Sequence, residues 1–126
     1  RHRDEVEFNY FKNGKTGNSS RYKLGFNPSE SMNLYAFEWR PSEIIWYIND
    51  EEVYRTPSDS FDIPTNPSNL FLSAWTGAKN IESWVGPARF GDAANADFAC
   101  VSFTPFSDKS YTCSDLFAED PQFQTN

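Results

Sequence analysis

The side chains that could do chemistry in this chain are mainly aromatic rings. The sequence contains no Ser/His/Asp arrangement, no glycine-rich phosphate loop and no set of residues with the spacing of a zinc site. Its single histidine is His2, near the start of the chain. The 126 residues include 12 Phe, 6 Tyr and 4 Trp, so that aromatic residues make up 17% of the chain. Such a composition suits β-sheets that present aromatic rings to a ligand.

Two cysteines, Cys100 and Cys113, lie near the C-terminal end. They allow two interpretations: a disulfide that ties the tail to the preceding strand, or two free thiols. A disulfide would indicate a secreted protein, because disulfides persist in oxidising compartments. Asn18 begins a glycosylation sequon, Asn18-Ser19-Ser20, in a polar loop. We therefore favour the disulfide and expect an extracellular location.

The composition also limits the classes of partner. The formal net charge is -7, and the only basic cluster is at residues 1–3. A nucleic-acid partner would need a basic stripe, so we expect none. No apolar run approaches the ~20 residues of a membrane span, so no membrane partner is expected either. The chain has the length of one domain at most and does not begin with a signal peptide, so we expect a mature protein or a piece of one.

The run from Leu34 to Asp50 predicts two strands joined by a short turn. Aromatic and β-branched residues alternate along both strands: Tyr35, Phe37 and Trp39 on the first, and Ile44, Trp46 and Ile48 on the second. This alternation is typical of half-buried antiparallel strands. Further strands are expected at 6–11, 21–26, 52–55, 69–75 and 98–103, and no amphipathic helix is expected. The short strands favour an all-β, antiparallel β-sandwich.

Six blocks of this sequence resemble the C-terminal part of glycoside hydrolase family 16, and in particular its lichenase- and laminarinase-like β-glucanases. The blocks are Phe8–Gly14, Leu24–Phe26, Tyr35–Trp39, Ile45–Asn49, Leu72–Gly77 and Trp84–Gly86. The resemblance implies a jelly-roll of two antiparallel sheets with a glucan groove on its concave face. Residues 1–106 would form the C-terminal part of this jelly-roll. Residues 107–126 would be an extended polar tail that the lichenases lack.

The family's catalytic strand has the pattern Glu-x-Asp-x-Glu, and two alignments with it remain open. In one, Glu5 is the nucleophile, Glu7 is the assisting acid and Asn9 replaces the acid/base. An amide cannot donate and retrieve a proton, so hydrolysis would then be crippled. In the alignment that we prefer, which needs no gap before the aromatic hairpin, the catalytic carboxylates lie upstream of Arg1 and this chain has none. The fold would then be incomplete without an N-terminal partner chain or segment, because sheet edges and an aromatic face would stay uncovered.

The resemblance also implies a set of substrate-binding residues. Only one of Asn9 and Tyr10 can face the groove, and Asn9 shares its strand face with Phe11. Trp75 would stack on a sugar ring, with a core tryptophan as the structural alternative. The predicted set is Asn9, Tyr10, Phe11, Ser73, Trp75 and Trp84.

Some positions depart from the family pattern. Ser73 replaces an asparagine that is usual in lichenases, which puts one hydrogen bond to sugar in doubt. Asp50 stands where a hairpin glycine is usual. The family's structural calcium uses an aspartate where this chain has Ala99, with Asp97 two residues earlier, so we expect no metal or other cofactor.

Two functions follow from these expectations. The first is a part of a secreted, retaining endo-β-1,3- or β-1,3-1,4-glucanase, in which this chain supplies the aromatic groove. The second is a non-catalytic glucan-binding or extracellular structural protein derived from the same fold. In both, a β-glucan polysaccharide is the expected ligand.

Overall fold

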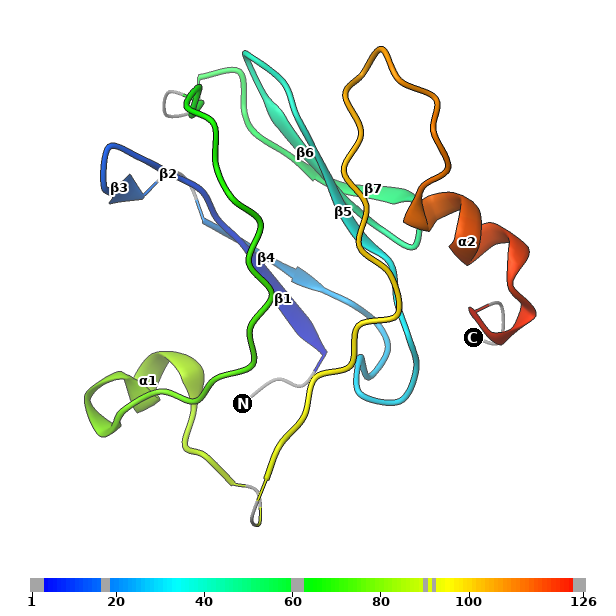
Figure 1. Cartoon of the computed structure of the whole chain (residues 1–126). Helices are drawn as coiled ribbons and strands as arrows, with labels where there is room; N and C mark the ends of the chain where they lie inside the picture. Colours follow the sequence, from blue (N-terminus) through cyan, green and yellow to red (C-terminus); the bar gives the residue numbers. More distant parts are fainter. Residues whose placement is uncertain (1–3, 17–18, 60–62, 90, 92, 124–126) are drawn as a thin grey trace. The chain divides into compact units, whose positions relative to one another are not determined.

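The computed structural model describes residues 4–16, 19–59, 63–89, 91 and 93–123 (Figure 1). These residues form two compact units. The smaller unit contains residues 67–99, and the larger contains the described residues before and after that segment. Each unit is described by itself below.

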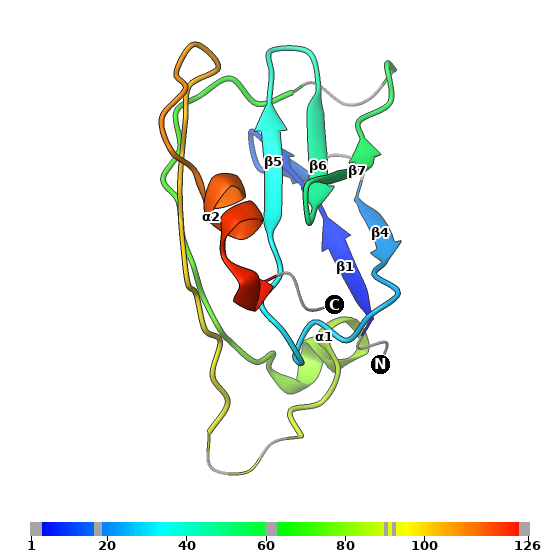
Figure 2. The ribbon, with the colours of Figure 1, turned by 90° about the vertical axis from the view of Figure 1, so that its right-hand side faces the viewer.

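The larger unit is built mainly from antiparallel strands. One pair joins β1 (Glu5–Phe8) to β4 (Ser20–Lys23), and a short hairpin between them joins β2 (Phe11–Lys12) to β3 (Lys15–Thr16). A three-stranded sheet has the order β5 (Tyr35–Trp39), β6 (Ile44–Ile48) and β7 (Glu51–Arg55). Figure 2 shows the β1–β4 pair next to the three-stranded sheet, and β4 contacts β7. The expected antiparallel all-β class is confirmed.

Tight turns close two of these hairpins. Asn13 and Gly14 have φ angles of 51° and 74° between β2 and β3, and Asn49 and Asp50 have φ angles of 50° and 66° between β6 and β7. Two consecutive left-handed residues match the right-handed twist of the flanking strands. Asp50 adopts this conformation at a position where glycine would do so without steric cost.

Aromatic rings from the two sheets form the core of the larger unit. The Trp46 ring centroid lies 5.5 Å from that of Phe8, 6.4 Å from that of Tyr10 and 5.3 Å from that of Tyr54. The expected alternation therefore places Phe8 and Tyr10 inside. Trp46 is buried as expected, whereas Trp39 is half-buried and donates its indole N–H to the Pro64 carbonyl at 2.7 Å.

A disulfide and a helix organise the C-terminal segment of the larger unit. Cys100 and Cys113 are bonded, which confirms the disulfide interpretation. Helix α2 (Cys113–Glu119) follows, and then the 3-10 helix η2 (Pro121–Phe123). The sequence predicted no amphipathic helix, and the seven-residue helix α2, none of whose residues is buried, was not foreseen. Thr112 and Asp115 form a capping box that satisfies free N–H groups at its start. The family-based division at residue 106 stays a prediction.

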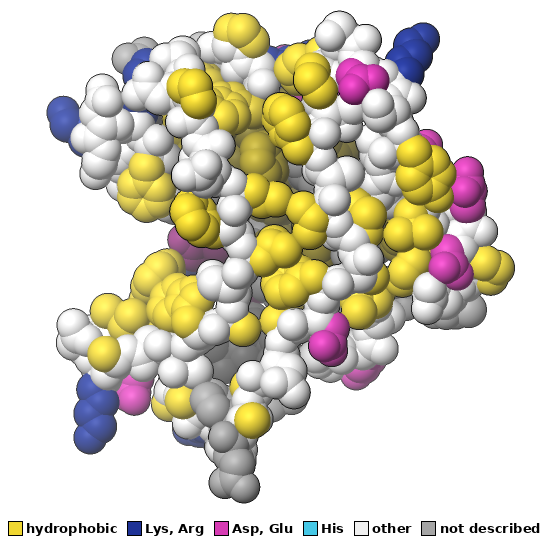
Figure 3. All heavy atoms as spheres, viewed as in Figure 1, with side chains coloured by type: hydrophobic (Ala, Val, Ile, Leu, Met, Phe, Trp, Pro, Cys, Tyr) yellow, Lys and Arg dark blue, Asp and Glu magenta, His cyan; other side chains and the backbone are white. Residues whose placement is uncertain are grey.

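The strands expected at 69–75 and 98–103 do not form. In the described part of the chain these segments belong to no β-ladder. Their short apolar runs favour a strand, but a strand needs the N–H and C=O groups of a neighbour, and no described segment supplies them. Several of their apolar side chains are consequently exposed, including Phe71 at 81% and Phe103 at 87%. Hydrophobic side chains reach the surface over much of the face shown in Figure 3.

Candidate functional site

The β1–β2 region carries three of the predicted site residues and separates them. Asn9 is exposed, and its Oδ1 accepts hydrogen bonds from the Tyr10 backbone N–H at 2.9 Å and from Thr16 Oγ1 at 3.0 Å. Phe11 is 60% exposed. Tyr10 is buried against Trp46, so it does not share the solvent side with Asn9 and Phe11. Of the two alternatives for Asn9 and Tyr10, the structure therefore places Asn9 outside.

The carboxylates of the alternative alignment take part in strand pairing. Glu7 lies opposite Arg21, and Glu5 lies opposite Lys23, in the β1–β4 ladder. Glu7 Oε2 accepts from Arg21 Nε at 3.1 Å. An ion pair of this kind between exposed side chains is common on β-sheets and is worth little energetically. It gives Glu7 a structural partner that an assisting acid does not require.

Two tryptophans face each other in the smaller unit. The ring centroids of Trp75 and Trp84 are 6.1 Å apart with an interplanar angle of 51°, and the residues are 59% and 51% exposed. Trp84 belongs to α1 (Glu82–Val85), which follows the 3-10 helix η1 (Lys79–Ile81). Both rings are thus only half-covered, which leaves aromatic surface available to a ligand.

Gly77 permits the close approach between these helices and the segment that carries Trp75. A Cβ atom on Gly77 would lie 2.3 Å from Val85 Cγ2 and 2.8 Å from Ile81 Cγ1. Both distances are shorter than any normal contact between carbon atoms. Glycine at this position therefore helps to place Trp84 beside Trp75.

Trp75 borders an open hollow of about 450 Å³, which we call the Trp75 hollow. Small and polar residues line the rest of it. Its complete lining is Ser73, Ala74, Trp75, Thr76, Ala94 and Asn95. An exposed indole next to hydroxyl and amide groups is the chemistry that holds a sugar, whose CH face packs on a ring while its hydroxyls form hydrogen bonds.

The structure groups the predicted site residues within each unit. Ser73, Trp75 and Trp84 come together in the smaller unit, whereas Asn9 and Phe11 belong to the larger one. Sequence reasoning missed Thr76 and Asn95. Thr76 follows Trp75 directly and could have been included on that ground. Asn95 lies in an irregular segment with no periodic pattern, so nothing in its spacing indicated it.

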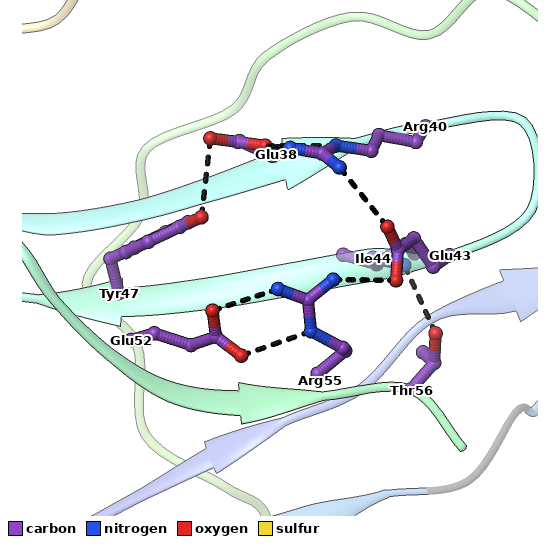
Figure 4. A network of polar contacts seen from close by, with 8 residues as sticks. All are labelled: Glu38, Arg40, Glu43, Ile44, Tyr47, Glu52, Arg55 and Thr56. Atoms are coloured by element: carbon purple, nitrogen blue, oxygen red, sulfur yellow. Dashed lines mark hydrogen bonds and ion pairs between the residues drawn. The ribbon is translucent and has the colours of Figure 1, made fainter. Parts of the chain in front are cut away.

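A network of charged residues occupies the three-stranded sheet and its turn (Figure 4). Arg40 contacts Glu38 and, at 3.2 Å, Glu43, while Arg55 contacts Glu43 and Glu52, each at 2.8 Å. The hydrogen bond that Arg40 donates to Glu38 raises the pKa of Arg40, and the hydrogen bonds that Arg55 donates lower the pKa of Glu52. Both shifts favour the charged forms of the paired groups, as expected of a structural network.

Glu38 also accepts a hydrogen bond from the neighbouring strand β6. The Tyr47 hydroxyl donates to Glu38 Oε1 at 3.2 Å. Burial, followed by this hydrogen bond, raises the pKa of Tyr47. The Glu38 carboxylate therefore has a hydrogen-bond partner on the neighbouring strand of the sheet.

Other expectations concern metals, membranes and glycosylation. Among the described residues, no group of three His, Cys, Asp or Glu side chains could hold a metal ion. None of the helices in the described ranges is long and apolar enough to cross a membrane. Asn18 lies outside the described residues, so its predicted glycosylation stays a prediction.

The family model of glycosyl hydrolases family 16 matches residues 1–94. The chain belongs to this family. It is 43% identical over 81 residues to a β-glucanase from Brevibacillus brevis, and the match covers 64% of this chain and 30% of the relative. A β-glucanase from Acetivibrio thermocellus is 33% identical over 101 residues, covering 80% of this chain and 29% of the relative.

Solved structures agree with the family assignment. The crystal structure of a native glycosidic hydrolase matches with a TM-score of 0.61 and 36% identity, covering 67% of this chain and 36% of the other. The β-glucanase of Bacillus licheniformis matches with a TM-score of 0.56 and 32% identity, covering 67% and 37%. This family-16 chain spans about a third of the length of these relatives. The predicted resemblance to the C-terminal part of the family is confirmed.

Proposed function

We propose that this family-16 chain is part of a retaining β-glucan hydrolase and supplies the aromatic side of its glucan groove. The observation that carries the proposal is the exposed Trp75 ring beside the hydroxyl and amide groups of the Trp75 hollow. The relatives that match this chain are β-glucanases, which supports a β-1,3 or mixed β-1,3-1,4 glucan as the ligand. In the larger unit, Asn9 and Phe11 are exposed and stay predicted glucan contacts.

The catalytic carboxylates would come from a polypeptide segment outside these 126 residues. Retaining hydrolysis needs two carboxyl groups about 5–5.5 Å apart, one of which must exchange a proton. Here Asn9 follows Glu5 and Glu7 on the chain, and Glu7 is bound to Arg21. Among the described strands, β1 pairs only with β4, so its other edge is available to a further strand. An N-terminal partner segment on that edge would cover it and bring carboxylates near Asn9.

We also propose that the protein works outside the cell. The Cys100–Cys113 disulfide supports this, because glutathione and thioredoxin keep such thiols reduced in most cytosols. Secretion is also what a polysaccharide substrate requires, since a long glucan cannot enter the cell.

The second candidate is a glucan-binding protein without catalysis. Ser73 favours it, because a serine hydroxyl replaces the amide that lichenases usually have at the sugar. The disulfide-linked C-terminal segment with α2, which is expected to be absent from lichenases, points the same way.

One experiment separates the two candidates. The full protein is incubated with barley mixed-linkage glucan and with laminarin, and both reducing ends and glucan affinity are measured. Release of reducing ends supports the hydrolase, and affinity without release supports the binder. A protein that neither binds nor cleaves either glucan contradicts both.

The variants Glu5→Gln and Glu7→Gln test where the carboxylates lie. If an N-terminal segment supplies them, both variants keep hydrolytic activity. A loss of activity on the order of 10⁴-fold in Glu5→Gln would instead assign the nucleophile to this strand.

A further inference from the structure

Asn95 differs from the other polar residues of the Trp75 hollow because it carries an amide. Ser73 and Thr76 each offer one hydroxyl, whereas Asn95 offers two N–H donors and a carbonyl acceptor. Its neighbours Ala94 and Ala74 are small, so the hollow stays open around it. An amide can bind two adjacent sugar hydroxyls at once, donating to one and accepting from the other.

The Asn95 side chain is also free for such a contact within the described part of the chain. It is exposed and makes no hydrogen bond to another described residue. Some other asparagines have structural partners, such as Asn49, whose Nδ2 donates to Asn33 Oδ1 at 3.1 Å and whose Oδ1 accepts from the Leu34 N–H at 2.9 Å. Those amides hold turns together, and the amide of Asn95 has no comparable role.

We propose that Asn95 determines which sugar configuration the Trp75 hollow accepts, an inference that rests on the proposed glucan-binding function. With a pyranose packed on the Trp75 indole, its equatorial hydroxyls point sideways from the ring edge toward the walls of the hollow. The Asn95 amide forms hydrogen bonds with two neighbouring equatorial hydroxyls of a β-glucosyl unit, donating to one and accepting from the other. An epimer with one of them axial leaves part of the amide unpaired, which is the arrangement that gives strong discrimination.

The chain provides matched variants for the test. Asn95→Ala removes the amide, and Asn95→Gln keeps it on a longer stem. Asn80→Ala removes an exposed amide from η1 in the same unit, outside the lining of the Trp75 hollow. Trp75→Ala removes the stacking surface itself. Calorimetric titration of the full protein with cellotetraose and with β-1,4-mannotetraose, which share their linkage and differ in the configuration of the 2-hydroxyl, measures affinity and configuration preference. Thermal unfolding checks each fold.

The proposal predicts that Asn95→Ala weakens cellotetraose binding by roughly two- to tenfold, the loss expected for one or two hydrogen bonds to the adjacent 2- and 3-hydroxyls of a β-1,4-linked glucosyl unit. The preference for the gluco- over the manno-oligosaccharide should fall with it. Asn95→Gln should recover part of the affinity, Asn80→Ala should behave as wild type, and all three variants should unfold at the wild-type temperature.

Two results would overturn the inference. One of them would contradict only the role of Asn95, and the other would contradict the proposed glucan-binding function as well. If Asn95→Ala keeps wild-type affinity and preference while Trp75→Ala loses affinity, Asn95 does not read the sugar and the proposed function stands. If neither Asn95→Ala nor Trp75→Ala changes binding, or if the wild-type protein does not bind, the proposed glucan site is wrong as well.

Discussion

Ser114 Oγ donates a hydrogen bond of 2.6 Å to Asp50 Oδ1, and so joins α2 to the turn between β6 and β7. Asp50 is the residue that occupies the usual glycine position of this turn, with φ at 66°. The Asp50 carboxylate therefore accepts a hydrogen bond that glycine at this position could not accept through a side chain. The C-terminal segment is attached to the sheet at this point and, through Cys100–Cys113, at the base of its own loop.

Replacing Asp50 should reveal both the backbone strain and the contact to α2. Asp50→Ala forces alanine into the left-handed backbone conformation, which alanine tolerates poorly, and removes the hydrogen-bond acceptor for Ser114. We expect the free energy of unfolding in urea to fall by about 1–2 kcal/mol. Asp50→Asn keeps both an acceptor and a side chain that tolerates positive φ, so its loss should stay below about 0.5 kcal/mol. Equal stability of the wild type and Asp50→Ala would show that the contact contributes nothing.

The disulfide should stabilise the larger unit by lowering the conformational entropy of the unfolded chain. Cys100 and Cys113 are 13 residues apart, and a loop of that length corresponds to roughly 3 kcal/mol in the chain-entropy model. Reductant should therefore lower the unfolding temperature of the wild type and leave a Cys100→Ser/Cys113→Ser variant unchanged. If the wild type unfolds at the same temperature with and without reductant, the bond does not stabilise the fold.

Gly77 should control the position of Trp84 relative to Trp75. Gly77→Ala places a methyl group 2.3 Å from Val85 Cγ2 and 2.8 Å from Ile81 Cγ1, so these side chains must shift, and we expect Trp84, which lies between them in the sequence, to shift with them. The matched control is Gly91→Ala, because a Cβ at Gly91 meets nothing within 4 Å. We expect Gly77→Ala to shift tryptophan fluorescence and weaken glucan binding at least roughly threefold, as loss of part of an aromatic contact would. Identical behaviour of the two variants would contradict this role of Gly77.

The capping box of α2 should weaken in acid. The Thr112 N–H donates to Asp115 Oδ2 at 2.7 Å, and this hydrogen bond, followed by that of the Thr112 hydroxyl, lowers the pKa of Asp115 from its ordinary value of 3.8. A lowered folded-state pKa gives stabilisation that is complete above the ordinary value and is lost as the pH falls below it. The stability difference between wild type and Asp115→Ala should therefore be larger at pH 6 than at pH 3. A difference that stays constant between these pH values would argue against the charged cap.

The aromatic hairpin was predictable because both of its strands, β5 and β6, lie next to each other in the sequence and pair with each other. Phe37 lies opposite Trp46 in the β5–β6 ladder, so the pairing was predicted correctly. The expected burial was not, because Phe37 is 57% exposed and Ile45, on the other face of its strand, is fully buried. The same reasoning failed for residues 69–75, where the pattern is equally strong but no described strand pairs with the segment. Periodicity reports which face of a strand is apolar, and it carries no information about whether a neighbour is present.

The candidate site was predictable only where the resemblance supplied it. Trp75 and Ser73 were expected from the family pattern, and they do line one hollow. Asn95 lines the same hollow, but it belongs to a segment with no regular secondary structure. Its position depends on the tertiary structure, so no local sequence pattern indicates it. Helix α2 was missed for a different reason, since its seven residues are too few for a clear helical period and only the Thr112–Asp115 cap marks its start.

The affinity of Trp75→Ala for barley mixed-linkage glucan tests the central claim most directly. Tyr111→Ala is the matched control, because Tyr111 is 61% exposed against 59% for Trp75 and does not line the Trp75 hollow. The account predicts that Trp75→Ala binds at least roughly tenfold more weakly than the wild type, while Tyr111→Ala binds equally well. Wild-type affinity in Trp75→Ala would show that the glucan does not lie on this ring.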